Sequence, residues 1–254
     1  MITSLTLLIL SLVALYIGAG WLVQGSSALA LKAKISPLVV GLTIVAFGTS
    51  APELVVSLNA TLSGQGDIAI GNIVGSNIFN IGVILGVSAT ICPLQVKKQL
   101  LRIDIPVMLA ATVLFTILFW NGTLGRTEGL FFLTGIIIYT IFSLFYSRKH
   151  GTEGSSQELE EQPKHWAVDT LAIVGGLVVL VFASRLLVDN AVSIAKELGV
   201  SEAVIGLTIV AAGTSMPELA TSIVAAYKRK TDIAIGNIVG SNLFNILTIA
   251  GSCS

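Results

Sequence analysis

The sequence predicts an all-helical polytopic membrane protein built from two inverted repeats. Three observations support this prediction. Only 11% of the 254 residues are charged and 54% are hydrophobic, whereas soluble domains carry roughly 25% charged residues. Long apolar runs recur along the chain, and about 20 apolar residues span a bilayer as a helix. Two blocks of sequence near the start return, almost unchanged, near the end.

The composition also excludes several classes of function. A soluble enzyme with so few charges would expose large apolar patches, and a disordered chain would not be so hydrophobic. The 14 basic and 14 acidic residues cancel, so we expect the lipid bilayer as partner and no nucleic acid. Cys92 and Cys253 adjoin apolar runs and indicate neither a disulfide framework nor a thiolate metal site.

Eight apolar segments are candidate transmembrane helices. In chain order they are 3–24, 37–58, 68–91, 105–121, 128–147, 168–188, 203–226 and 233–253. The polar stretch after the fifth segment is typical of a solvated linker. We therefore expect a first repeat of five helices at 1–147, a cytoplasmic linker at 148–166, and a second repeat with three helices at 167–254.

The distribution of Lys and Arg predicts the orientation. If every segment crosses the membrane once, 11 of the 14 basic residues lie on one side. They are Lys32, Lys34, Lys97, Lys98, Arg102, Arg148, Lys149, Lys164, Lys228, Arg229 and Lys230. Basic residues are retained in the cytoplasm. The N-terminus is therefore predicted to be periplasmic, in a protein of the bacterial inner membrane.

The repeated blocks share one offset. Residues 67–77 and 232–242 both read DIAIGNIVGSN, and GLTIVAFGTSAPEL at 41–54 matches GLTIVAAGTSMPEL at 206–219 at 12 of 14 positions. Both pairs are 165 residues apart, which indicates a duplicated unit. Because the first unit has an odd number of helices, its copy enters the membrane from the opposite side, as in many secondary transporters.

The second repeat is expected to be incomplete. A copy of the unit that ends near residue 147 would end at about residue 312, but residue 254 is the last of this chain. We therefore expect a five-plus-five helix arrangement in which the second repeat is truncated after its third helix.

Two acidic residues, Glu53 and Glu218, lie deep within apolar runs at equivalent positions. A charged group at mid-membrane costs about 2.5–3.5 kcal/mol and usually marks an ion or proton pathway. The alternative is a protonated carboxyl that serves packing. Each acid follows a threonine and a serine by four and three residues, so the three side chains can share one helical face. The two trios are Thr49, Ser50, Glu53 and Thr214, Ser215, Glu218.

Proline and glycine predict that the helices carrying these acids are broken. Pro52 and Pro217 free the carbonyl four residues earlier, at Gly48 and Gly213. Discontinuous helices supply backbone carbonyls to cations in transporters. A simple proline kink is the alternative, but it would not explain the adjacent hydroxyls and acid.

The second block of each repeat carries a stripe of small polar residues on an apolar helix. The sets are Asn72, Ser76, Asn77 and Asn80, and Asn237, Ser241, Asn242 and Asn245. We expect Ser76, Asn80, Ser241 and Asn245 to contact or support an ion, although amides also join helices to each other. Gly71 and Gly75, with their copies Gly236 and Gly240, predict close helix packing.

These candidate ligands are all oxygens. Ca²⁺ takes 6–8 oxygen ligands, and softer metals prefer thiolate or imidazole. Two carboxylates balance one Ca²⁺ or two monovalent ions, or share protons. We expect secondary active antiport of Ca²⁺ against Na⁺ or H⁺ by alternating access, with no catalytic residue and no cofactor. The alternatives are Ca²⁺/H⁺ exchange only, a truncated chain inactive in transport, and an intramembrane enzyme with Glu53 and Glu218 as acid and base.

The motifs GTSAPEL with GNIVGSNIFN, and GTSMPEL with GNIVGSNLFN, resemble the two alpha-repeats of the calcium/cation antiporter superfamily, which includes the sodium/calcium exchangers. The resemblance implies ten helices, with ions held by the second and third helix of each repeat. The implied side-chain ligands are Thr49, Ser50, Glu53, Ser76, Asn80, Thr214, Ser215, Glu218, Ser241 and Asn245. The implied backbone ligands are the carbonyls of Ala46 and Ala211. Some members have Asp at the position of Asn245, so the resemblance does not fix the coupling ion.

Overall fold

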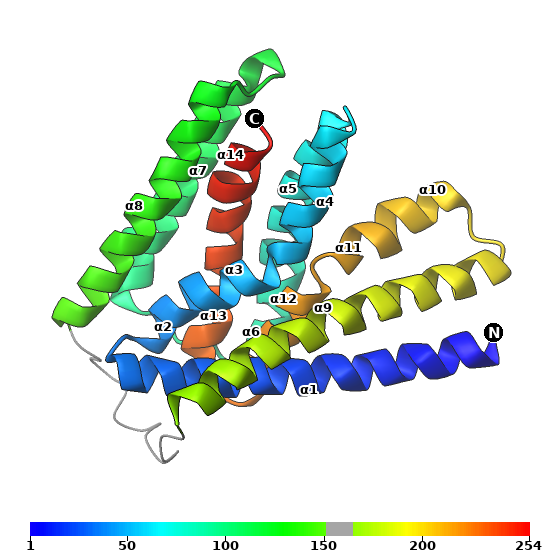
Figure 1. Cartoon of the computed structure of the whole chain (residues 1–254), viewed down its shortest axis with the longest axis horizontal. Helices are drawn as coiled ribbons and strands as arrows, with labels where there is room; N and C mark the ends of the chain where they lie inside the picture. Colours follow the sequence, from blue (N-terminus) through cyan, green and yellow to red (C-terminus); the bar gives the residue numbers. More distant parts are fainter. Residues whose placement is uncertain (151–164) are drawn as a thin grey trace.

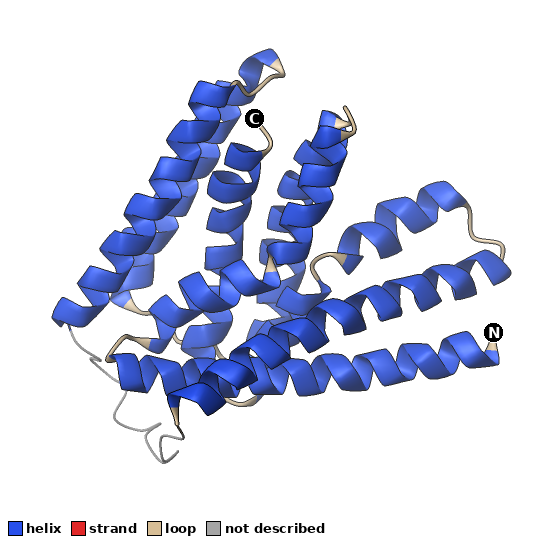
Figure 2. Cartoon of the chain, in the orientation of Figure 1, coloured by secondary structure: helices blue, strands red, loops and turns tan. Residues whose placement is uncertain are grey.

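The computed structural model describes residues 1–150 and 165–254, and every regular element in these ranges is a helix (Figure 2). Most of the linker predicted at 148–166 lies outside the described residues. Six continuous helical segments are long and apolar enough to cross a membrane. They are Ile2–Ala33, Gly66–Ile91, Leu100–Asn121, Arg126–His150, Trp166–Glu197 and Thr231–Ser252.

The second helix of each repeat is broken, as the prolines predict. In the first repeat, α2 (Pro37–Val40), a π-helical turn and α3 (Ala46–Thr49) lead to α4 (Ala51–Leu62), with a bend of 46° between Pro37–Thr49 and Ala51–Leu62. This bent pair counts as a seventh candidate span. The predicted span at 203–226 forms α10 (Glu202–Ile205), a π-helical turn, α11 (Ala211–Gly213) and α12 (Met216–Tyr227), and it is not among the candidate spans of the described residues.

Two long helices pack side by side along one face of the molecule (Figure 1). They are α1 (Ile2–Ala33) and α9 (Trp166–Glu197). Gly18 and Gly176 permit this packing, because a Cβ added to Gly176 would lie 2.7 Å from the carbonyl oxygen of Gly18. Lys32 pairs with Asp169 at one end, and the N-terminal amine pairs with Glu197 at 3.1 Å at the other. The two helices are therefore antiparallel.

The third helix of the second repeat lies at the centre of the molecule (Figure 1). It consists of α13 (Thr231–Phe244), a π-helical turn at Asn245–Ile249, and α14 (Ala250–Ser252). In its apolar window 94% of the residues are buried. It contacts α2 and α3 on one side, and α7 (Ile105–Leu118) and α8 (Arg126–His150) on the other.

The equivalent helix of the first repeat is far more exposed, although its sequence is nearly identical. It consists of α5 (Gly66–Phe79), a π-helical turn at Asn80–Leu85, and α6 (Gly86–Ile91), and 28% of its apolar window is buried. Ile78 is 67% exposed, whereas its twin Leu243 is completely buried. The two repeats therefore share their elements but not their surroundings.

The glycines show one part of this difference, at the contact between the third helix of one repeat and the broken helix of the other. A Cβ on Gly236 would lie 2.6 Å from the carbonyl oxygen of Leu38 and 2.9 Å from the Cα of Gly41, so α13 and the first broken helix are in direct backbone contact. The twins Gly71 and Gly206 have no such neighbour within 4 Å. Close packing by these glycines is confirmed for the second copy, but it is wrong for Gly71 and Gly75.

Candidate cation site at the crossing of the repeats

Glu53 and Glu218 lie near the start of the second segments of the two broken helices. Each lies in the first turn of its segment, α4 or α12, where free amides and the helix dipole favour a negative charge. Each is only 1% exposed. Among the described residues, neither carboxylate forms a salt bridge. Two acidic groups are thus enclosed without a basic partner.

The serine at each helix break donates a hydrogen bond to the acid of the other repeat. Ser50 Oγ donates to Glu218 Oε1 at 2.7 Å, and Ser215 Oγ donates to Glu53 Oε1 at 3.0 Å. Both serines are buried. The two bonds are equivalent under the 165-residue offset, so the halves are related by approximate two-fold symmetry at this point.

Asparagines at equivalent positions fix the start of each acidic segment. Asn72 Nδ2 donates to the carbonyl oxygen of Glu53 at 3.2 Å and to Ser57 Oγ at 2.9 Å. The equivalent bonds run from Asn237 Nδ2 to the carbonyl oxygen of Glu218 at 3.3 Å and to Ser222 Oγ at 2.9 Å. The third helix of each repeat thereby holds the acid of its own repeat in place.

The threonines complete the cross-links. Thr49 Oγ1 donates to Asn237 Oδ1 at 3.0 Å, and Thr214 Oγ1 lies 3.4 Å from Asn72 Oδ1. Further along the same helices, the amide groups of the two repeats bond to each other. Asn80 Nδ2 donates to Asn242 Oδ1, and Asn245 Nδ2 donates to Asn77 Oδ1, both at 3.0 Å.

Six buried side-chain oxygens of the predicted ligands lack a hydrogen-bond partner within the described structure. They form three symmetric pairs: Glu53 Oε2 and Glu218 Oε2, Ser76 Oγ and Ser241 Oγ, and Asn80 Oδ1 and Asn245 Oδ1. An unpartnered buried polar atom costs about 1–3 kcal/mol. A hard cation satisfies such oxygens, and the two carboxylates would neutralise its charge. The donor set therefore fits a desolvated cation.

Hydrogen bonds between the two repeats involve eight of the twelve predicted residues, namely Thr49, Ser50, Glu53, Asn80, Thr214, Ser215, Glu218 and Asn245. Ser76 and Ser241 are buried without a hydrogen-bond partner in the described structure.

The backbone oxygens predicted at Ala46 and Ala211 each lie within 3.5 Å of the hydroxyl of the threonine three residues later. Ala46 is buried, and its carbonyl accepts from the Ser50 amide at 3.0 Å. Thr49 Oγ1, which donates to Asn237 Oδ1, lies 3.3 Å from the same carbonyl. Thr214 Oγ1 lies 3.5 Å from the carbonyl of Ala211, which is exposed.

Ser57 and Ser222 were missed by the sequence reasoning. Each lies four residues after its acid and hence on the same helical face, and this spacing could have identified them. A third buried acid, Asp104, was also missed, because it adjoins an apolar run rather than lying inside it. Asp104 is completely buried and accepts from the Tyr139 hydroxyl at 2.9 Å.

The sequence model of the sodium/calcium exchanger protein family matches residues 3–145 and 168–254. The chain belongs to the sodium/calcium exchanger family. This membrane antiporter is 38% identical to the inner membrane protein YrbG of Escherichia coli, over 99% of the chain and 79% of YrbG.

Two further relatives have a named function or a solved structure. It is 32% identical to the sodium/calcium exchanger MaX1 of Methanosarcina acetivorans, over 96% of the chain and 81% of MaX1. Its fold matches the sodium-calcium exchanger NCX_Mj with a TM-score of 0.87 and 33% identity, over 100% of the chain and 82% of that structure. The six apolar helices and the similarity to membrane proteins identify the exchanger as a multi-pass membrane protein.

Proposed function

We propose that this exchanger moves Ca²⁺ against Na⁺ or H⁺ at the site between Glu53 and Glu218. The observation that carries the proposal is the set of six buried, unpartnered oxygens in three symmetric pairs. One Ca²⁺, two Na⁺ and two protons each carry a total charge that balances the two carboxylates. These ions can therefore compete for one site. Competition couples their movements without a second site.

Alternating access requires that the site open to one side at a time. The first broken helix packs on α13, while α10 and its π-helical turn do not pack on α5. We infer that these two helix pairs close in turn. With the N-terminus in the periplasm, the closed pair lies on the cytoplasmic side and the open pair faces the periplasm.

The proposed topology follows from the repeats. Residues 1–147 form the first inverted repeat and 167–254 the equivalent of its first three helices, joined by the cytoplasmic linker 148–166. The segment from α10 to α12 is proposed as an eighth, broken crossing, because its copy in the first repeat spans the required length.

Ion binding and flux test the proposal separately. Ca²⁺ should raise the melting temperature of the purified chain, because a ligand that binds only the folded state stabilises it. At a free Ca²⁺ concentration of 100 times Kd, this stabilisation is about 2.7 kcal/mol. Uptake of radioactive Ca²⁺ by vesicles under an imposed Na⁺ or pH gradient then identifies the counter-ion. Glu53→Gln and Glu218→Gln should each weaken binding roughly tenfold or more, since a charged ligand contributes about 1.5–3 kcal/mol.

Glu197→Gln is the matched control. It makes the same chemical change at a side chain of α9 that is 46% exposed and lies outside both broken helices, and it should leave binding and uptake unchanged. If either buried variant binds and transports Ca²⁺ like the parent, the proposed site is wrong. Uptake driven by a pH gradient but not by Na⁺ would assign H⁺ as the counter-ion.

A further inference from the structure

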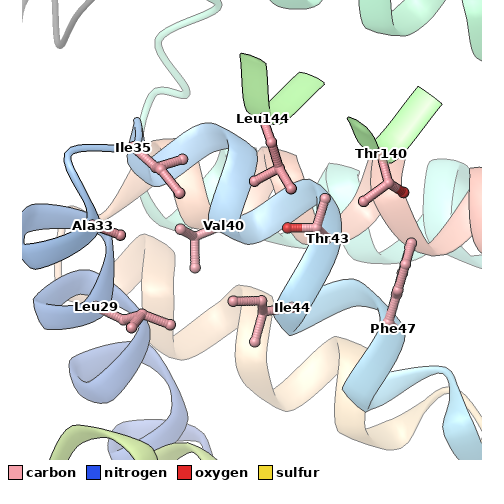
Figure 3. A pocket seen from close by; sticks show the side chains of 9 residues that line it. All are labelled: Leu29, Ala33, Ile35, Val40, Thr43, Ile44, Phe47, Thr140 and Leu144. Carbon is pink, nitrogen blue, oxygen red and sulfur yellow. The ribbon is translucent and has the colours of Figure 1, made fainter. Parts of the chain in front are cut away.

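An apolar groove lies between the end of α1, the first broken helix and α8 (Figure 3). Its volume is about 330 Å³. The lining includes Leu29, Val40, Ile44, Phe47 and Leu144, and the buried hydroxyl of the lining residue Thr140 has no partner in the described structure. Ile44 is 39% exposed, so the groove is open to the bilayer.

Two basic residues adjoin lining residues of this groove in the sequence. Lys34 lies between two lining residues, Ala33 and Ile35, in the chain. Arg148 follows the lining residue Leu144 by one helical turn and therefore lies on the same face of α8. Both are exposed, and neither forms an ion pair with any described residue.

The backbone near these two residues is held in place. The amide of Ser36 donates to Ser147 Oγ at 2.7 Å, and both residues are buried. This bond ties the turn after α1 to the end of α8, so Lys34 and Arg148 are presented at a fixed edge. The neighbouring acid, Asp169, is already paired with Lys32.

We propose that this groove binds an anionic phospholipid, with one acyl chain along its apolar lining and the phosphate between Lys34 and Arg148. An apolar groove open to the bilayer accepts an acyl chain of any phospholipid. The unpaired basic residues that adjoin it select a negatively charged headgroup, because juxtamembrane Lys and Arg attract anionic lipids.

The bound lipid would touch the transport machinery. Val40, Ile44 and Phe47 belong to the broken helix that leads to Glu53. The ring of Phe47 packs on Phe244 of α13 at 4.8 Å. The lipid would therefore brace the closed helix pair from its outer side, whichever ions the exchanger carries.

Native mass spectrometry of the full chain tests this with two probes, phosphatidylglycerol and phosphatidylcholine. We expect tighter binding of phosphatidylglycerol. Lys34→Asn with Arg148→Gln should weaken it roughly 10- to 30-fold and leave phosphatidylcholine unaffected. Asn is chosen because Lys34 has a left-handed φ of 54°, which Asn tolerates. Ile44→Trp, which fills the groove, should weaken both lipids.

The matched control is Arg229→Asn with Lys98→Gln. Arg229 also has a left-handed φ, of 58°, and both basic residues are exposed away from the groove. This control should keep the affinity for phosphatidylglycerol. Equal binding of both lipids, an equal loss in the control, no effect of Ile44→Trp, or displacement by inorganic phosphate alone would each overturn the proposal.

Discussion

Asn72 and Asn237 make the same hydrogen bonds in different surroundings. Each donates to the backbone of its acid and to a serine one turn later, and each accepts from a threonine of the other repeat. Asn237 is completely buried, whereas Asn72 is half-buried. The internal duplication therefore provides a matched pair for measuring what burial adds to one side-chain network.

Asn237→Ala should destabilise the exchanger by about 2–3 kcal/mol, and Asn72→Ala by about 1 kcal/mol. The larger cost arises because the groups left behind by Asn237 cannot be reached by water. Melting temperatures of the two variants in one detergent give the comparison. Equal losses would mean that burial does not govern the strength of this network.

At the scale of elements, the glycines of α5 and α13 distinguish the closed helix pair from the open one. The residues are the same in sequence, yet only those of α13 meet another backbone. A Cβ added at Gly236 would clash with the backbone of the first broken helix, whereas a Cβ added at Gly71 would have no neighbouring atom within 4 Å. This contrast separates effects on folding from effects on exchange.

Gly236→Ala should lower the stability strongly, because its Cβ would lie 2.6 Å from a backbone oxygen. Gly71→Ala should be neutral or stabilising by up to about 1 kcal/mol, since Ala favours the helix. Gly71→Ala should nevertheless slow Ca²⁺ exchange if α10 must close on α5. Normal exchange rates together with normal stability would contradict this closure.

The sequence predicted the elements better than their contacts. Pro52 and Pro217 located both helix breaks, because a missing amide acts locally. The different burial of α5 and α13 could not be read from the residues they share, because it depends on the helices that cover them: α13 and its continuation contact α7 and α8, whereas α5 contacts no equivalent pair among the described residues. At the candidate site, the trios around Glu53 and Glu218 were predicted from spacing alone, and their role as ligands stays a prediction. The crossing of Ser50 to Glu218 was not predicted, because it depends on how distant segments meet.

At the scale of the whole molecule, basic residues gather at one end of the helices. Lys32 pairs with Asp169 and Lys97 pairs with Asp232 at that end, whereas the N-terminal amine and Lys196 pair at the other. The same division underlies the proposed orientation. The two native cysteines offer a direct measure of it.

Cys92 follows α6 and should face the cytoplasm. In a Cys253→Ala background, an impermeant maleimide should label Cys92 only after intact cells are opened. A cysteine at the exposed loop residue Thr123, introduced as Thr123→Cys without the native cysteines, should be labelled from outside. The reverse pattern would show that the orientation is inverted.

The exchanged serine–acid bonds have a consequence for the history of the fold. One copy of the unit contains both a serine and an acid, but its serine reaches only the acid of the other copy. A protein made of a single unit would have to dimerise with a second molecule inserted upside down to complete either carboxylate's coordination. Fusion of two such genes would then place both units, in opposite orientations, within one polypeptide.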